Sequence, residues 1–218
     1  MSPFAALLRR DLAAMFGSGA RGGAALPVLF FLAVATLYPF AVGSDARLLA
    51  DTGGGVLWIA ALLAALLPIE RLVRPDLELG LFDQLALRGV AEEASLAARI
   101  LAHWLSFGPP LMVAALPGAA LMGIEAQTLL NLELGLLVGT PGLAALGVMV
   151  AGLTAALRSG AALGGLLAIP LAVPPLIFGA GSLDGNGDGA LALTGAASLV
   201  LLALAPFAAG AAIRAARE

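Results

Sequence analysis

The sequence predicts an all-α polytopic membrane protein, with one membrane domain over residues 1–218, and two observations support this. The chain is 61% hydrophobic and 11% charged, with a mean hydropathy of +1.04, whereas soluble domains are roughly 25% charged. The apolar residues also gather into uncharged runs, each close to the roughly 20 residues that a helix needs to cross a bilayer. We therefore expect six transmembrane helices, at about residues 23–43, 53–70, 98–120, 130–157, 160–181 and 190–213.

The arginines predict the orientation of these spans. Ten of the eleven positive charges lie in alternate connections, and only Arg47 lies in a connection of the opposite class. The ten are Arg9, Arg10, Arg21, Arg71, Arg74, Arg88, Arg99, Arg158, Arg214 and Arg217. Short loops rich in arginine stay on the cytoplasmic side, so both termini are expected there. The net charge is −3, so nucleic acid is not an expected partner, whereas the apolar spans make membrane lipid one.

Residues 3–16 precede the first span and carry a helical stripe of apolar side chains. The stripe consists of Phe4, Leu7, Leu8, Leu12, Met15 and Phe16. It predicts an amphipathic helix lying in the inner membrane interface, with an ordinary charged tail as the alternative. Arg9 and Arg10 on this segment, and Trp58 and Trp104 in the second and third spans, are expected at membrane interfaces.

Prolines interrupt several spans, above all the fifth. Pro170, Pro174 and Pro175 lie in it, and each proline removes a backbone donor and kinks a helix. Whether the fifth span is one continuous helix, two short pieces or a re-entrant hairpin stays open. Closely spaced glycines permit tight contacts between helices, and a packing role is favoured for them over a transport path.

The residue types limit the chemistry expected of this chain. Without cysteine it forms no disulfide, thiolate metal site or thioether haem attachment. Without lysine it has no phosphate-binding loop of the Walker type, so ATP-driven work requires an ATPase on another polypeptide. No Ser/His/Asp set, two-metal cluster or paired acid with histidine is visible, so we expect no enzyme and no metal. His103, the single histidine, is a possible haem contact, but beside Trp104 an interface anchor is favoured.

The longest polar connection, residues 70–99, is expected inside. Leu77, Leu81 and Leu85 recur at every fourth position in it, with Phe82 beside them. This spacing predicts a short amphipathic helix parallel to the membrane. From the residues alone, it is either a solvated helix or a docking element for a cytoplasmic partner.

Motifs spread over nearly the whole chain resemble those of a known family. They are Phe30-Phe31, Tyr38-Pro39-Phe40, Gly55-Val56-Leu57-Trp58, Ala98–Leu105, Gly139-Thr140-Pro141, and Pro170 and Pro174 leading to Leu176–Gly181. In this order they resemble the haem exporter protein B family of cytochrome c maturation (CcmB). The resemblance runs from Leu7 to about Arg214.

That resemblance implies a membrane (permease) subunit of an ABC transporter complex in the bacterial inner membrane, similar in architecture to type-2 ABC exporter permeases. Members act as a homodimer with two copies of the ATPase CcmA, and associate with CcmC, CcmD and the periplasmic chaperone CcmE. ATP is then expected on CcmA and haem on CcmC, with no cofactor bound by this chain. The implied function couples ATP hydrolysis to haem export or to release of haem-loaded CcmE from CcmC.

The resemblance also favours the docking interpretation of the inner connection. In the family this connection resembles a coupling helix that grips the ATPase. The corresponding residues here are Asp76, Glu78, Gly80, Leu81, Phe82, Asp83, Gln84 and Leu85. Asp83 stands where a glutamate is usual, and Arg88-Gly89 where a Ser-Pro turn is usual.

Two alternative functions remain, a non-transporting scaffold of the haem-handling complex and an ion-driven secondary transporter. The second alternative requires a buried pair of acids near the bilayer midplane. The uncharged runs contain no Asp or Glu, so the sequence favours the transporter subunit or the scaffold.

Overall fold

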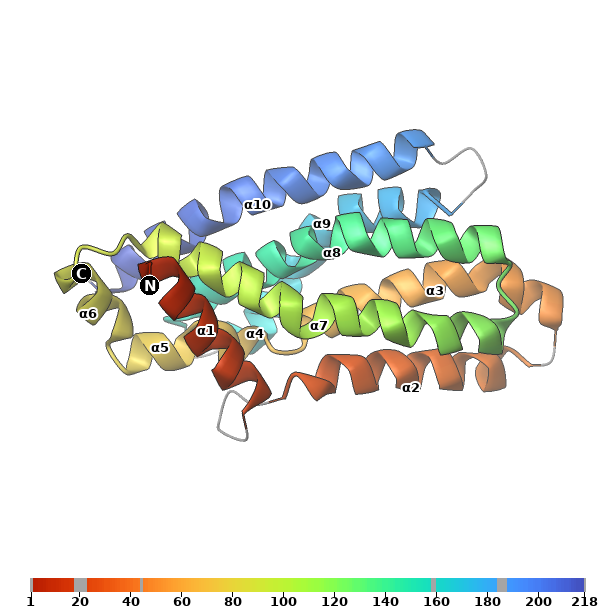
Figure 1. Ribbon diagram of the computed structural model, residues 1–218, viewed down its shortest axis with the longest axis horizontal. Helices are drawn as coiled ribbons and strands as arrows, with labels where there is room; N and C mark the ends of the chain where they lie inside the picture. The colour runs from red at the N-terminus through yellow and green to blue at the C-terminus, as the bar shows by residue number, and fades with distance from the viewer. Residues whose placement is uncertain (1, 18–22, 44, 158–159, 184–187, 218) are drawn as a thin grey trace.

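The computed structural model describes residues 2–17, 23–43, 45–157, 160–183 and 188–217. Within these ranges the chain forms helices and no strands, and the long helices run side by side along the longest axis of the molecule (Figure 1). The helices are α1 (Pro3–Phe16), α2 (Ala25–Val42), α3 (Ala46–Leu66), α4 (Ile69–Leu72), α5 (Arg74–Glu78), α6 (Leu81–Leu87), α7 (Glu92–Met122), α8 (Ala126–Thr154), α9 (Gly160–Gly181) and α10 (Asp188–Arg217).

Six helices in the described part of the chain are long and apolar enough to cross a membrane, namely α2, α3, α7, α8, α9 and α10. The predicted all-α polytopic fold is therefore confirmed. α7 begins at Glu92 and has 31 residues, which is longer than the span expected from residue 98. Its extra turns lie beyond the uncharged run, where charged side chains of α10 contact them.

The fifth span is one continuous helix. α9 passes through Pro170, Pro174 and Pro175 without a break, so the alternatives of two short pieces and a re-entrant hairpin are wrong. α8 and α10 both pack along α9, and neighbouring helices allow a spanning helix to tolerate the backbone groups that prolines leave unpaired. α7 runs through three prolines in the same way.

α8 is the most buried of the six spans, and glycines let its neighbours approach it closely. A Cβ atom added at Gly142 would lie 2.6 Å from Cα of Ser198, and one added at Gly152 would lie 2.6 Å from Cβ of Ala209. Both contacts are made by α10. Only a glycine leaves room for the facing helix at these two positions.

Trp58 is fully buried, so the prediction that it anchors the chain at a membrane interface is wrong. Its indole fills a slot formed by Gly135 and Gly139 of α8 and Gly179 of α9. A Cβ atom added at Gly139 or Gly179 would lie 2.5 or 2.6 Å from the indole ring. Three glycines from two other helices create this slot, and nothing in the sequence next to Trp58 indicates it.

We predict that Gly142→Ala and Gly152→Ala each lower the thermal unfolding midpoint of the detergent-solubilised protein. The added methyl group forces α8 and α10 apart, and overpacking of this kind costs about 1–3 kcal/mol. Gly165→Ala on α9 is the matched control, because nothing lies within 4 Å of the added Cβ. Equal midpoints for all three variants would contradict the close approach of α8 and α10.

Candidate functional site

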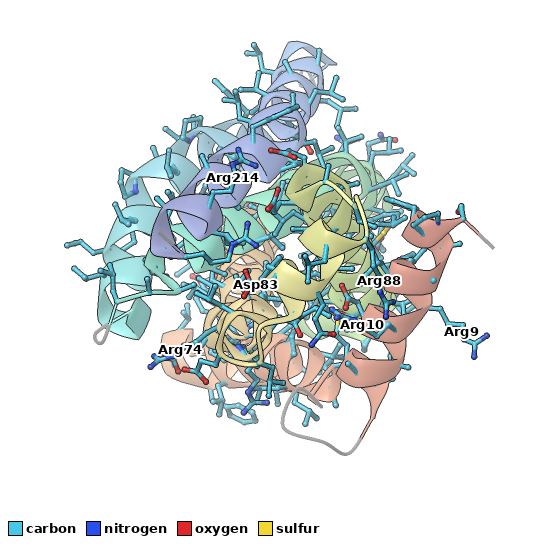
Figure 2. The ribbon with its side chains drawn as sticks, turned by 90° about the vertical axis from the view of Figure 1, so that its left-hand side faces the viewer. Arg9, Arg10, Arg74, Asp83, Arg88 and Arg214 are labelled. Carbon is cyan, nitrogen blue, oxygen red and sulfur yellow. The ribbon has the colours of Figure 1, made fainter. Side chains whose placement is uncertain are left out.

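The candidate functional site is the end of the bundle that carries both termini, which we call the inner end. α1, α4, α5, α6, the first turns of α7 and the last turns of α10 form it (Figure 1). Figure 2 looks onto this end and labels Arg9, Arg10, Arg74, Arg88 and Arg214 there. Arg47 lies at the opposite end, in the first turn of α3. Arg21 and Arg158 lie outside the described residues. The described arginines are therefore segregated along the bundle axis as the sequence predicts.

Prolines and glycines shape the connection between α3 and α7. Pro68 follows α3, Pro75 lies in the first turn of α5, and Gly80 separates α5 from α6 with a φ of 67°. A side chain at this left-handed position would strain the backbone, so glycine makes the sharp turn possible. The connection thus folds as short separate helices, whereas the leucine spacing predicted one helix across residues 77–85.

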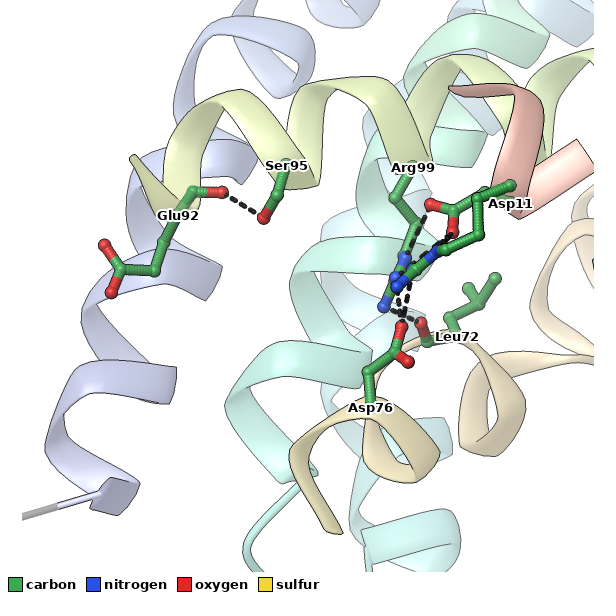
Figure 3. Close-up of polar contacts among 7 residues, drawn as sticks. Asp11, Leu72, Asp76, Glu92, Ser95 and Arg99 are labelled. Carbon is green, nitrogen blue, oxygen red and sulfur yellow. Dashed lines mark hydrogen bonds and ion pairs between the residues drawn. The ribbon is translucent and has the colours of Figure 1, made fainter. Parts of the chain in front are cut away.

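A buried ionic cluster joins α1, α5 and α7 (Figure 3), and we call it the α1–α5–α7 cluster. It consists of Arg10, Asp11, Asp76 and Arg99. Arg99 donates from Nη1 to the carbonyl oxygen of Leu72 at 2.6 Å and from Nε to Oδ2 of Asp11 at 3.1 Å, and its Nη2 pairs with Asp76. Arg10 donates from Nη2 to Oδ2 of Asp76 at 2.8 Å and from Nε to Oδ1 of Asp11 at 2.9 Å.

The two carboxylates and two guanidiniums of this cluster balance in charge. Asp11, Asp76 and Arg99 are buried, and buried charges are tolerated only when they are paired and hydrogen-bonded. Burial acts to lower the pKa of Arg10, but Asp11 and Asp76 more than offset it and hold that pKa above its ordinary value. Asp76 is therefore an internal ion-pair partner, and the prediction that it contacts the ATPase is wrong. Arg10 likewise turns toward α5, whereas Arg9 points away from the bundle (Figure 2).

Sequence reasoning missed Asp11 and Arg99 as members of a site. Arg99 counted only toward the topology and the family motifs, and Asp11 was given no role. In the structure, Asp11 lies one helical turn after Leu7, and these are the buried residues of α1, which packs on α7. An acid four residues after an apolar position on an amphipathic helix is the signal that was available.

A second group of ion pairs ties the end of α10 to α6 and α7, and we call it the α6–α7–α10 cluster. Arg214 donates from Nη1 to Oε1 of Glu93 at 2.6 Å, and Arg217 donates from Nη1 to Oδ1 of Asp83 at 3.0 Å. Arg217 also pairs with Glu92. These groups are more exposed than those of the first cluster, so solvent screens the pairs and each adds little stability. Their main effect is to position α6 beside the C-terminal turn of α10.

Phe82 faces the core, so the prediction that it anchors a docked partner is wrong. Only 1% of Phe82 is exposed, and Cζ of Arg99 lies 5.9 Å from its ring centre. Leu81 and Leu85 are half-buried. The most exposed apolar side chains here are instead those of Leu79, which is 73% exposed, and Leu87, which is 89% exposed. We call the exposed set the α6 face: Leu79, Asp83, Gln84, Leu87 and Arg88.

Glu78 and Gly80 lie just before the α6 face. Glu78 is exposed and accepts a hydrogen bond from Nε of Arg74 at 2.9 Å, one helical turn away. That bond raises the pKa of the Arg74 guanidinium above its ordinary value. Gly80 supplies the turn rather than a contact.

His103 and Trp104 hold α7 against its neighbours. His103 is buried, with Nε2 3.0 Å from the carbonyl oxygen of Ala65 and its ring centre 4.7 Å from that of Phe107. The prediction that it is an interface anchor is wrong, because the side chain lies inside the bundle. Trp104 is half-buried and donates from Nε1 to the hydroxyl of Thr140 at 3.0 Å. Among the described residues, no group of three or more His, Asp or Glu side chains is placed to hold a metal ion.

These features define a multi-pass, all-α membrane protein with its ionic and amphipathic elements at one end. The family model described as CcmB protein matches residues 2–216. The Heme exporter protein B of Rhodobacter capsulatus is 44% identical over 214 residues, which cover 96% of this chain and 97% of that protein. Its counterpart from Bradyrhizobium diazoefficiens is 40% identical over 220 residues, 98% of each chain. That of Escherichia coli K12 is 38% identical over 193 residues, 86% of this chain and 88% of that protein.

The chain therefore belongs to the CcmB family and is a multi-pass bacterial membrane protein. The resemblance drawn from its motifs is confirmed over nearly its whole length. The matched region includes the α1–α5–α7 cluster, the α6 face and every member of the α6–α7–α10 cluster except Arg217.

We predict that Phe82→Ala destabilises the inner end of the protein. Truncating a fully buried phenylalanine typically costs about 3–5 kcal/mol, so the thermal midpoint of the purified chain should fall clearly. Phe207→Ala on α10 is the control, because that ring is exposed on the outside of the bundle and its loss removes little packing. A Phe82→Ala variant as stable as Phe207→Ala would restore a surface role for Phe82.

Proposed function

We propose that this chain is the membrane (permease) subunit of an ABC-type haem export complex in the bacterial inner membrane. The name Heme exporter protein B, which its relatives carry, supports the haem export system. The α6 face is the single observation that supports coupling of this chain to ATP hydrolysis by a partner. Leu79 and Leu87 are apolar side chains left largely exposed at the inner end, where charged residues otherwise predominate.

A groove on a cytoplasmic ATPase is the occupant that suits the α6 face. Leu87 at the end of α6, and Leu79 just before the turn into it, are apolar anchors of the kind that a groove on a partner receives. The membrane surface suits this face less well, because Asp83 and Glu78 offset the charge of Arg88 and leave the face without a net attraction to anionic lipid. The face is also held rigidly, since Phe82 is buried behind it and Arg217 holds Asp83. A rigid face loses little entropy on docking, which favours affinity.

The chain then acts as the mechanical part of the complex. It has no lysine for a phosphate-binding loop, so a partner ATPase of the CcmA type, in two copies on a homodimer of this chain, supplies hydrolysis. CcmC holds the haem, with CcmD and CcmE as further partners. The output of hydrolysis is haem export or the release of haem-loaded CcmE from CcmC. A non-transporting scaffold driven by the same ATPase is the alternative for this last step.

We predict that Leu79→Ala combined with Leu87→Ala weakens binding of the ATPase. Removing two docking leucines should cost on the order of 2 kcal/mol, about a 30-fold loss of affinity. Co-purification of the ATPase and maturation of cytochrome c should fall together, while the thermal midpoint of the chain should not, because neither leucine is buried.

The matched control is Leu48→Ala, which truncates an exposed leucine at the opposite end of the bundle. It should leave co-purification intact. Unchanged binding of the ATPase to the double variant would remove the α6 face from the coupling contact.

We also predict that both termini are cytoplasmic, as the ten-to-one arginine distribution requires. A reporter fused after Arg217 should show cytoplasmic activity only. A fusion after Arg47, in the first turn of α3, should show periplasmic activity and serves as the opposite control. Periplasmic activity after Arg217 would overturn the even number of spans.

A further inference from the structure

The α1–α5–α7 cluster lies directly behind the α6 face. Asp76 sits on α5, four residues before the turn at Gly80 that leads into α6. Figure 3 shows the carboxylates of Asp11 and Asp76 converging on Arg99. A movement of α5 therefore acts on α7 through Arg99, and on α1 through Arg10, which donates to Asp76 at 2.8 Å.

The burial of this cluster makes it a stiff connection. Asp11, Asp76 and Arg99 are all nearly inaccessible to water, so none can leave its partners and be solvated in place. Separating one partner leaves an uncompensated charge in surroundings of low polarity, which is strongly unfavourable. α5 therefore moves together with Arg99 and Arg10, or the cluster exchanges partners.

A small cavity next to the cluster gives it room to move. Its volume is about 30 Å³, and its polar lining includes Asp11, Arg71, Arg99 and His103, while Ala14 of α1 lies on its apolar part. A space of this size admits at most one or two water molecules, too few to solvate a separated charge. Interiors are otherwise close-packed, so the cavity lets α1 and the Arg99 side chain shift without unpacking the spans.

We propose that Asp76, Arg99, Asp11 and Arg10 are positioning residues that convert movement of the docked ATPase into displacement of α1 and α7. This proposal rests on the proposed function, because it takes the α6 face as the ATPase contact. It assigns α1 a mechanical role in addition to its place at the membrane surface. The cluster itself touches neither nucleotide nor cargo.

The test uses the complete complex with its ATPase, reconstituted in lipid nanodiscs, and a single introduced cysteine, Ala14→Cys. The chain has no cysteine of its own, so maleimide labelling of this chain reports on that position alone. Ala14 lines the cavity on α1. We expect ATP with vanadate to change its labelling rate at least threefold in the otherwise unchanged complex.

Asp76→Asn should keep the ATPase bound and hydrolysing ATP. It should abolish the ATP-dependent change in labelling and lower cytochrome c maturation at least tenfold. Arg10→Gln is the second variant, since Arg10 is partly exposed and its loss leaves the Arg99–Asp76 pair in place. It should reduce the same change, because Arg10 is the direct link between α1 and Asp76.

The exposed Arg47–Asp51 pair at the opposite end supplies both controls. Asp51→Asn and Arg47→Gln make the same chemical changes and should leave labelling and maturation as they are. A full ATP-dependent change in Asp76→Asn would overturn the proposal, and so would loss of the ATPase from that variant, since Asp76 would then act in docking. If Asp76→Asn fails to accumulate, Arg10→Gln decides, and an unaltered response there overturns the proposal.

Failure of the proposed function has a different signature. In that case no ATPase accompanies the unsubstituted chain, or Leu79→Ala with Leu87→Ala leaves its binding intact. Both results come from co-purification of the ATPase and can be obtained before any variant of the α1–α5–α7 cluster is made.

Discussion

The guanidinium of Arg99 is the constraint on which the inner end depends. It is a positive charge taken out of water near the base of a membrane span, and it is tolerated because two carboxylates and one carbonyl oxygen surround it. Those groups come from α1, from α5 and from the end of α4. Each of these elements must lie where it does to complete the set, so one buried charge fixes three segments far apart in the sequence.

The same arrangement explains why α6 is a rigid element rather than a loose loop. Behind α6, Phe82 is buried against Arg99, and beside α6, Asp83 is held by Arg217 of α10. Ion pairs therefore hold α7 at two places. Arg99 pairs with residues of α1 and α5, and Glu92 pairs with Arg217 of α10. α6 is therefore in direct contact with α7 through Arg99 and with α10 through Arg217.

The spans could be predicted from the sequence because a membrane imposes simple requirements. Every backbone polar group in lipid must be satisfied within the helix, so the length of an apolar run and the position of arginines carry most of the information. The inner connection could not be predicted as well. Leucine spacing identified apolar positions, but burial depends on neighbours that spacing does not contain. Asp76 turns inward because Arg99, 23 residues later, is there to meet it.

The continuous course of α9 and the burial of Trp58 could not be predicted from the sequence, for a related reason. A proline indicates a possible break, yet the break occurs only if no neighbouring helix supports the freed backbone. A tryptophan favours an interface, yet three glycines on α8 and α9 provide a slot that fits its ring. In both cases the outcome is decided by helix packing, which single-sequence patterns do not record.

The structure divides its stabilising interactions along the bundle axis. In the spans, glycines of α8 lie in close contact with α10 and with the indole of Trp58. These helices therefore have little free space in which to move relative to one another. At the inner end the contacts are ionic and lie beside a small cavity with a partly polar lining. Ion pairs can exchange partners over short distances, whereas a close-packed glycine contact has no second arrangement within reach. A movement imposed on the inner end should therefore displace α1, α5 and the base of α7 first. The tightly packed middle of the bundle then carries it onward as a unit.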